Sequence, residues 1–156
     1  MKTIHQAGAA AVEFALVVLI FLALVLGTVQ FGWLLYSYVV LTTAASTGAH
    51  VLASQRGYSA PYTNTKNAIL AAAAPIASAT ALASNMTISV TVGGTSCQSD
   101  ALCSAALGTG SQAPNAGTQA SVSISYPFVP MAGGALVVRA SLLPTALQTS
   151  MSELVQ

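Results

Sequence analysis

Two patterns of apolar positions divide this chain: a long unbroken run near the N-terminus and shorter alternating runs in the second half. Residues 14–36 read FALVVLIFLALVLGTVQFGWLLY and contain no side chain that is charged at pH 7. A helix over this run would rise roughly 35 Å, which is enough to cross a hydrocarbon core of about 30 Å. Trp33 and Tyr36 stand at the end of the run, where amphipathic rings prefer the membrane interface. The run therefore predicts a transmembrane helix.

The helix is expected to continue beyond the membrane. Residues 37–54 contain no proline, and their apolar side chains recur at helical spacing. Gly57 suits a helix end, so a single helix of about forty residues is predicted. A second, alanine-rich helix is predicted over residues 64–83, where Pro75 should kink it or split it in two.

The pattern changes to a period of two farther along the chain, which indicates half-buried strands. Residues 86–92 and 120–128 alternate apolar side chains with Ser or Thr. Residues 135–143 are a third, less regular candidate, and the tail at 144–156 is expected to be a short helix or frayed. About three antiparallel strands whose apolar face covers the helices make an α+β fold.

The chain carries very little charge, with four Lys or Arg against three Asp or Glu, or 4% of all residues. About a quarter of the residues in a soluble domain are usually charged, so a free cytosolic globule is not expected. Binding to nucleic acid needs clustered basic side chains. The basic residues here are scattered along the sequence, at Lys2, Arg56, Lys66 and Arg139. No nucleic-acid partner is therefore expected.

The sequence also lacks the groups that catalysis needs. After Glu13 the only carboxylates are Asp100 and Glu153, and there is no credible set of Ser, His and Asp and no phosphate-binding glycine motif. His50 lies near the predicted span, where an interfacial or packing role is expected. We therefore expect no enzymatic activity, no cofactor, no metal and no small-molecule substrate.

A polar insertion at residues 93–119 separates the first two predicted strands and holds Cys97 and Cys103. In an exported chain, two cysteines this close together most simply form a disulfide. Metal binding is the alternative, although two cysteines supply only half of a tetrahedral zinc site. Residues 104–119 are rich in Gly, Ser, Ala and Thr and are expected to be a flexible loop.

The N-terminal side of the span carries the signals for orientation and for a functional residue. Lys2 precedes the span and the next basic residue, Arg56, lies well beyond it, so the positive-inside rule places the N-terminus in the cytoplasm. The apolar run is longer than a secretory signal needs, although the small residues at 42–49 leave signal-peptide cleavage open. Glu13 is a lone carboxylate at the mouth of the span, and it either lies solvated at the interface or awaits a positive partner.

The N-terminal segment as a whole resembles a known family. The stretch GAAAVEFALVVLIFLALVLGTVQFGWLLYSYVVLTTAASTGAHVLA, with its EF-A-L core and its A-A-x-x-G-A pattern, is similar to the N-terminus of TadE-like pilins. These are the pseudopilins of the tight-adherence (Flp, type IVb) pilus system. The resemblance implies that a prepilin peptidase cuts between Gly8 and Ala9 on the cytoplasmic side and removes the leader MKTIHQAG. Glu13 would then be the fifth mature residue, followed by Phe14, and would set the register of subunit packing.

The resemblance implies a minor pilin or pseudopilin that takes part in pilus assembly and supports surface adhesion and biofilm formation. Its expected partners are the prepilin peptidase, other pilin subunits, the pilus assembly platform and the membrane. Its expected place is the bacterial inner membrane, as a single-pass protein with its C-terminal part exported, and the pilus or cell surface after assembly. The alternative is an uncleaved single-pass anchor whose exported domain binds a partner in the envelope. An ordinary secreted or lipid-anchored binding domain is a third interpretation.

These interpretations divide the chain into segments. The expected segments are a leader at 1–8, a transmembrane and assembly helix at 9–36, its exported continuation at 37–56, and a small α+β domain at 57–156 with a flexible, disulfide-containing loop at 93–119.

Overall fold

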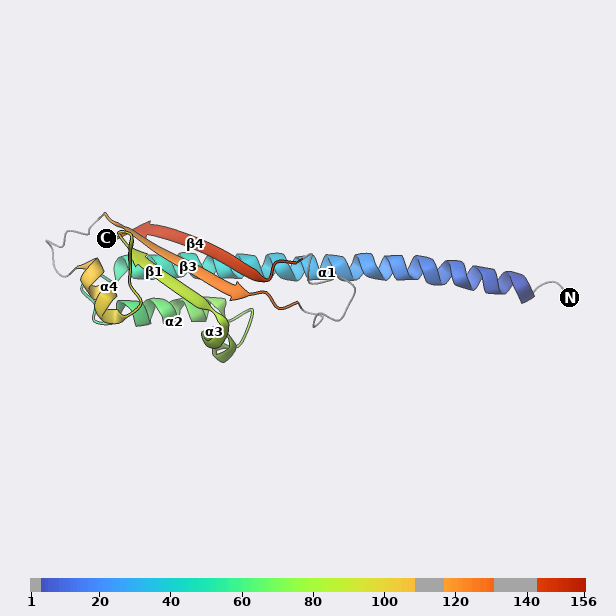
Figure 1. The fold of residues 1–156 in the computed structure, drawn as a ribbon, viewed down its shortest axis with the longest axis horizontal. Coiled ribbons are helices and arrows are strands. Elements are labelled where there is room, and N and C mark those ends of the chain that lie inside the picture. The colour runs from blue at the N-terminus through green and yellow to red at the C-terminus, as the bar shows by residue number, and fades with distance from the viewer. Residues whose placement is uncertain (1–3, 109–116, 131–142) are drawn as a thin grey trace. The chain divides into compact units, whose positions relative to one another are not determined.

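The computed structural model describes residues 4–108, 117–130 and 143–156 of the chain. The chain divides into two compact units, and α1 contributes residues to both. The units are Met1–Leu35 with Val129–Leu143, and Tyr36–Phe128 with Pro144–Gln156. The elements drawn in Figure 1 are α1 (Ile4–Ser54), α2 (Pro61–Ala73), α3 (Ala79–Asn85), β1 (Thr87–Val92), β2 (Thr95–Ser96), α4 (Asp100–Leu107), β3 (Gln119–Pro127) and β4 (Ala146–Leu154).

α1 is a single helix of 51 residues that includes the predicted span and its continuation. Its stretch Ala10–Ser54 is long and apolar enough to cross a membrane, with a mean hydropathy of 2.7 in its most apolar part. Hydroxyl groups along it donate to the carbonyl oxygen four residues earlier, as in Thr28 to Leu24 at 2.9 Å. Such bonds satisfy polar side chains that lipid could not satisfy. The expectation of one helix that continues past the apolar run is confirmed.

Pro75 splits the second predicted helix in two, as expected, because proline has no N–H to continue a helical ladder. α2 ends before it and α3 begins after it. α2 also begins earlier than predicted, at Pro61, since proline is tolerated in a first turn, where the N–H would have no partner. The Ser78 side chain caps α3 by accepting a hydrogen bond from the amide of Ala81 at 3.4 Å.

The strands form one antiparallel sheet of four strands in the order β2-β1-β3-β4. Val122 of β3 lies opposite Val90 of β1 on one side and Met151 of β4 on the other. The α+β class is confirmed, with four strands where about three were expected.

The expectation of a helical or frayed tail is wrong, because residues 146–154 form β4. On its inward face only Leu147 is buried, and Thr149 and Glu153 break the apolar alternation that marks a strand. β4 forms because all nine of its residues are in register with β3, through backbone pairing that a side-chain pattern does not reveal. The candidate strand at 135–143 lies outside the described residues except for its last position.

Part of the segment expected to be a flexible loop, residues 93–119, is regular structure and contains β2 and α4. The Ser99 side chain caps α4 by accepting from the amide of Leu102 at 3.4 Å, and Cys103 and Leu107 are buried. Asp100 adds a negative charge in the first turn, which favours the helix N-terminus. The sequence did not predict this helix start because the surrounding residues are mostly small and polar. Residues 109–116 of the expected loop lie outside the described residues.

The core of the second unit lies between the apolar face of the sheet and the helices α1 and α2. Figure 1 shows β3 and β4 lying along the second half of α1. The largest fully buried apolar side chains come from all of these elements and include Leu41, Leu52, Ile69, Val90, Val122 and Ile124. Gly48 marks the closest approach, since a Cβ there would lie 2.5 Å from Ile69 Cγ1 and 3.6 Å from Val122 Cγ1. Glycine is therefore needed where α1, α2 and β3 meet.

Replacing Gly48 with Ala should destabilise the fold despite the better helix propensity of alanine. Overpacking of a tight core typically costs about 1–3 kcal/mol, which exceeds the roughly 0.5–1 kcal/mol gained by removing a helical glycine. Thermal unfolding of the full chain in detergent, followed by circular dichroism, measures this difference. Gly27→Ala is the matched control, because a Cβ there would meet no atom within 4 Å. Equal melting temperatures for the two variants would contradict the packing argument.

Candidate functional site

The residues that the sequence assigns to processing and assembly lie near the N-terminal end of α1. Gly8, Ala9, Glu13 and Phe14 are all helical. A Cβ at Gly8 would meet no atom within 4 Å, and Phe14 has 70% of its surface exposed. Glu13 is exposed, and it makes no hydrogen bond or ion pair with any described residue. The helix therefore brings these residues together within about two turns, with the Glu13 carboxylate available to an external partner.

The apolar side chains of this part of α1 are turned outward around the helix. None of the most apolar stretch is buried by the rest of the chain. More than half of the surface is exposed in Val12, Phe14, Leu16, Val17, Leu19, Ile20, Phe21, Leu22 and Leu24. Contiguous apolar patches of this kind mark membrane or protein contacts. Lipid, or apolar helices of other subunits, would satisfy this surface.

The C-terminal end of the apolar run contains two uncharged polar side chains that the charge pattern of the sequence does not reveal. Trp33 Nε1 donates to the backbone oxygen of Val129 at 3.1 Å, which satisfies the indole N–H. Gln30 is buried, and its Oε1 has no hydrogen-bond partner among the described residues. A scan of the span for amides as well as for charges would have found Gln30.

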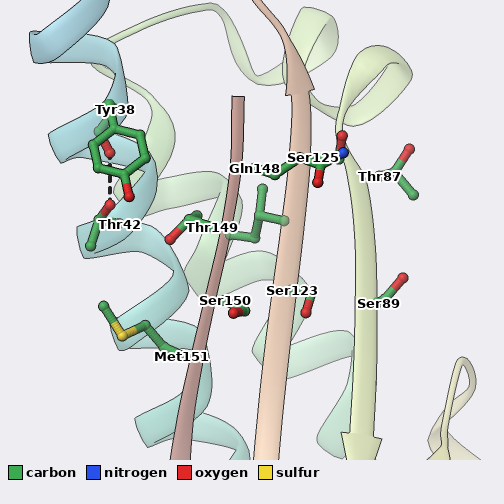
Figure 2. A pocket seen from close by; sticks show the side chains of 11 residues that line it. Tyr38, Thr42, Thr87, Ser89, Ser123, Ser125, Gln148, Thr149, Ser150 and Met151 are labelled. Carbon is green, nitrogen blue, oxygen red and sulfur yellow. Dashed lines mark hydrogen bonds between the residues drawn. The ribbon is translucent and has the colours of Figure 1, made fainter. Parts of the chain in front are cut away.

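A groove of about 550 Å³ lies beside β4 in the second unit. Figure 2 shows Tyr38 and Thr42 of α1 on one side of it and Thr149 and Met151 of β4 facing them. The other lining residues are Thr87, Ser89, Ser123, Ile124, Ser125, Gln148 and Ser150. None of the lining side chains is charged at neutral pH, so the groove suits an uncharged occupant.

The sheet face opposite the core carries small polar side chains on each of its three long strands. In register order they are Thr87, Ser89 and Thr91, then Ser125, Ser123 and Ser121, then Gln148, Ser150 and Ser152. Thr91 Oγ1 and Ser121 Oγ share a hydrogen bond of 2.6 Å, and Gln119 Nε2 donates to Ser152 Oγ at 2.8 Å. This face is therefore solvated by hydroxyl and amide groups rather than by charges.

Asp100 joins α2 to α4. Its carboxylate accepts hydrogen bonds from the Thr63 hydroxyl at 2.6 Å and from the Thr63 backbone N–H at 2.8 Å. Thr63 is in the first turn of α2 and Asp100 in the first turn of α4, so one negative charge serves two helix N-termini. The hydroxyl bond from Thr63, followed by its backbone bond, lowers the pKa of Asp100 from its ordinary value of 3.8.

Cys97 and Cys103 form a disulfide, as the sequence predicted, with their Cα atoms 4.9 Å apart. Both cysteines are fully buried. In the loop-entropy model such a small ring contributes about 2 kcal/mol to folding stability. Among the described residues, no three His, Cys, Asp or Glu side chains gather into a group that could hold a metal ion.

His50 and Glu153 connect α1 to β4 through a side-chain contact, with His50 Nδ1 3.0 Å from Glu153 Oε2. Both side chains are exposed enough for water to screen the pair, so it adds little to stability. The pair shows that β4 runs close to the last turns of α1. His50 thus links α1 to β4 at the surface.

Comparison with known families gives a match to the N-terminal helix α1. A family model described as TadE-like protein matches residues 8–50. This segment is TadE-like. No curated protein and no solved structure gave a match. The match confirms the resemblance seen in the sequence, and it covers less than a third of the 156 residues.

The TadE-like segment begins at Gly8, contains Glu13 and Phe14, and ends at His50. It includes the apolar half of α1 but none of the strands. The groove, the disulfide and the hydroxyl face all involve residues beyond the TadE-like segment, so their roles must be argued from the structure.

The Asp100 contact should make the stability of the domain that follows the TadE-like segment depend on pH. Because the folded pKa lies below 3.8, the folded protein holds this proton less tightly than the unfolded chain does. The contact therefore stabilises the fold above pH 3.8, and this contribution is lost as the pH falls through the lowered folded pKa.

Asp100→Asn should lower the melting temperature at neutral pH and match the unmodified chain at acidic pH, below the folded pKa. Thr63→Val is the graded control, because it removes the hydroxyl donor but keeps the backbone N–H, and its effect should be smaller. Thermal unfolding across this pH range measures both variants. A difference between Asp100→Asn and the unmodified chain that is constant with pH would argue against the contact.

Proposed function

We propose that this protein is a minor pilin or pseudopilin of a tight-adherence (Flp, type IVb) pilus. A prepilin peptidase cuts between Gly8 and Ala9, and the processed protein takes part in pilus assembly and so supports surface adhesion and biofilm formation. The observation that carries this proposal is the TadE-like match, which begins at Gly8 and includes a lone exposed carboxylate, Glu13, at the start of an unpartnered apolar helix.

Cleavage after Gly8 requires local unwinding, because the bond lies inside α1. Gly8 favours such unwinding, since a glycine in a helix interior costs roughly 0.5–1 kcal/mol relative to alanine. A Cβ there would touch nothing, so no packing opposes access to the peptide bond. The new N-terminus at Ala9 adds a positive amine one helical turn before Glu13.

The geometry of the processed helix favours Glu13 as a residue that sets register. Positions 9 and 13 lie on one face of a helix, and a carboxylate in the first turns complements the helix dipole. In a bundle of apolar helices, Glu13 can pair with the Ala9 amine of a neighbouring subunit. Burying such a pair costs desolvation energy that can exceed the attraction, so its contribution is to alignment more than to stability. The exposed apolar side chains supply the contact area.

The expected partners are those of processing and assembly. They are the prepilin peptidase, other pilin subunits, the assembly platform and the membrane. The protein crosses the bacterial inner membrane once, with its N-terminus in the cytoplasm and the domain after residue 56 exported, and moves to the pilus or cell surface on assembly. Lys2 before the span and Arg56 after its continuation support this orientation.

A second candidate function is an uncleaved single-pass anchor. The helical conformation of Ile4–Gly8 favours it, since proteases generally need an extended substrate and α1 is continuous there. In this case the exported domain would bind a partner in the envelope while the leader remains attached.

Processing distinguishes these two functions. When the chain is produced together with the prepilin peptidase, the pilin proposal expects a mature protein that starts at Ala9, as measured by intact mass and N-terminal sequencing. Gly8→Leu should block the cut, because a bulky side chain replaces the small residue at the cleavage site, whereas Gly27→Ala should leave it unchanged. A full-length chain that retains MKTIHQAG would support the anchor instead.

Glu13→Ala should leave membrane insertion and cleavage intact but lower incorporation into pili by roughly tenfold or more, because the pair that aligns neighbouring helices is lost. Pilus fractions sheared from cells and quantified by immunoblotting measure incorporation. Glu153→Ala is the control, because that carboxylate lies in β4 and pairs only weakly with His50 at the surface. Normal incorporation of the Glu13→Ala protein would contradict the proposed role.

A further inference from the structure

β4 is an edge strand, and no strand of the described residues pairs with its outer side. In an antiparallel strand, alternate residues direct their backbone N–H and C=O to opposite sides. Thr145 O accepts from Phe128 N at 3.1 Å, and Val155 N donates to Thr118 O at 2.8 Å. The backbone N–H and C=O groups of the odd-numbered residues of β4 therefore point to β3. Those of the even-numbered residues point to the free edge. No partner among the described residues binds the backbone groups of Gln148, Ser150, Ser152 and Leu154.

Several features that commonly protect an edge strand are missing from β4, although Glu153 places one charge on its inward face. Proteins blunt exposed edges with Lys, Pro, bulges or very short strands. β4 has nine residues, contains neither Lys nor Pro, and keeps an unbroken one-to-one register with β3. At the opposite edge of the sheet, β2 has only two residues. β2 pairs only with Thr91 and Val92 of β1, so β1 is also partly open, and β4 is the longer of the two open edges.

The groove described above includes the space between β4 and α1, and its lining continues over the polar face of β3 and β1. Tyr38 is 46% exposed and Met151 is 37% exposed, although both belong to the side on which the sheet packs against α1 (Figure 2). The sheet therefore leaves part of α1 uncovered at this edge. A fifth strand beside β4 would occupy the part of the groove next to α1 and cover both side chains.

The direction of β4 argues against a second copy of this chain as the occupant. Tyr38 and Thr42 lie beside Thr149 and Met151, His50 pairs with Glu153, and the Gln156 amide donates to Ala53 O at 3.2 Å. β4 therefore runs in the same direction as α1. An antiparallel pair of β4 strands would place residue 36 of the two copies at opposite ends, which two subunits anchored in one membrane cannot accommodate. Parallel pairing offsets its partners by a residue and so cannot form an exact two-fold dimer.

We propose that the free edge of β4 binds an extended, uncharged peptide segment of a partner protein, which adds to the sheet as a fifth strand. Main-chain hydrogen bonds to Gln148, Ser150 and Ser152 hold the segment. Its apolar side chains alternate with small polar ones: the apolar set packs on Tyr38 and Met151, and the polar set continues the hydroxyl face. Since the lining carries no charge, a charged side chain in the segment would lose hydration without gaining a partner. This proposal needs a membrane anchor but not the pilus role.

The test uses the full chain in detergent micelles and a defined probe, the end-blocked peptide TISVTV, which has the required alternation and no charge. A peptide of the same composition in the order TTSIVV is the control. Hydrogen exchange followed by NMR should find the amides of Gln148, Ser150 and Ser152 unprotected in the protein alone. Saturating TISVTV should slow their exchange by roughly tenfold or more, and TTSIVV should not.

Ser150→Pro removes an outward N–H without breaking a bond to β3, so it should weaken TISVTV binding by roughly tenfold or more. Ser150→Ala keeps the N–H and should bind as the unmodified chain does. If the proline variant fails to fold, the exchange measurement on the unmodified chain decides alone.

Three results would overturn the proposal. The first is protection of these amides in the monomer without peptide, which would mean that the chain covers its own edge. The second is protection that rises with protein concentration alone and accompanies dimerisation, which would assign the edge to a second copy. The third is no protection by TISVTV, or equal protection by both peptides.

Discussion

The whole structure depends on one helix that must be stable in two different surroundings. The first half of α1 presents large apolar side chains in every direction, while one face of its last turns is buried under a sheet and a second helix. Only a helix satisfies its backbone polar groups internally in lipid and can also continue into a protein core. A change in side-chain size along α1, from large in its first half to small in its second, makes this possible. Small residues such as Ala44, Gly48 and Ala49 let α2 and β3 approach the helix where lipid-facing positions carry Leu, Val and Phe.

The same constraint explains how the chain uses polarity with so little charge. Outside the apolar half of α1, the sheet face is solvated by Ser, Thr and Gln, and each carboxylate has a defined place. Asp100 serves two helix N-termini, and Glu153 pairs with His50 across α1 and β4. A surface without charges does not repel a second surface of the same kind. It also leaves the edge of β4 without the lysines that commonly protect such edges.

The sequence predicted those elements whose stability depends on side-chain pattern. The apolar run, the split at Pro75, and the alternation in β1 and β3 all reflect burial, and the Cys97–Cys103 spacing reflected a local covalent bond. β4 and α4 were missed for a different reason. β4 depends on backbone pairing with a strand more than twenty residues earlier, and α4 on a cap at Ser99 within a small polar stretch. The unpaired edge and the groove could not be predicted, because they depend on strand order and on how far the sheet extends across α1.

The position of the TadE-like segment relative to the core has a consequence for processing. The match ends at His50, yet Leu41, Ala45 and Ala49 within it are completely buried in the core of the second unit. The segment therefore supplies part of the core of the domain and cannot be treated as a separate anchor. The proposed cut after Gly8 lies more than thirty residues before the first of these core positions. These core positions all lie after the proposed cut, so removal of the leader would leave them in the chain, and cleavage changes the charge and length of the apolar end of α1.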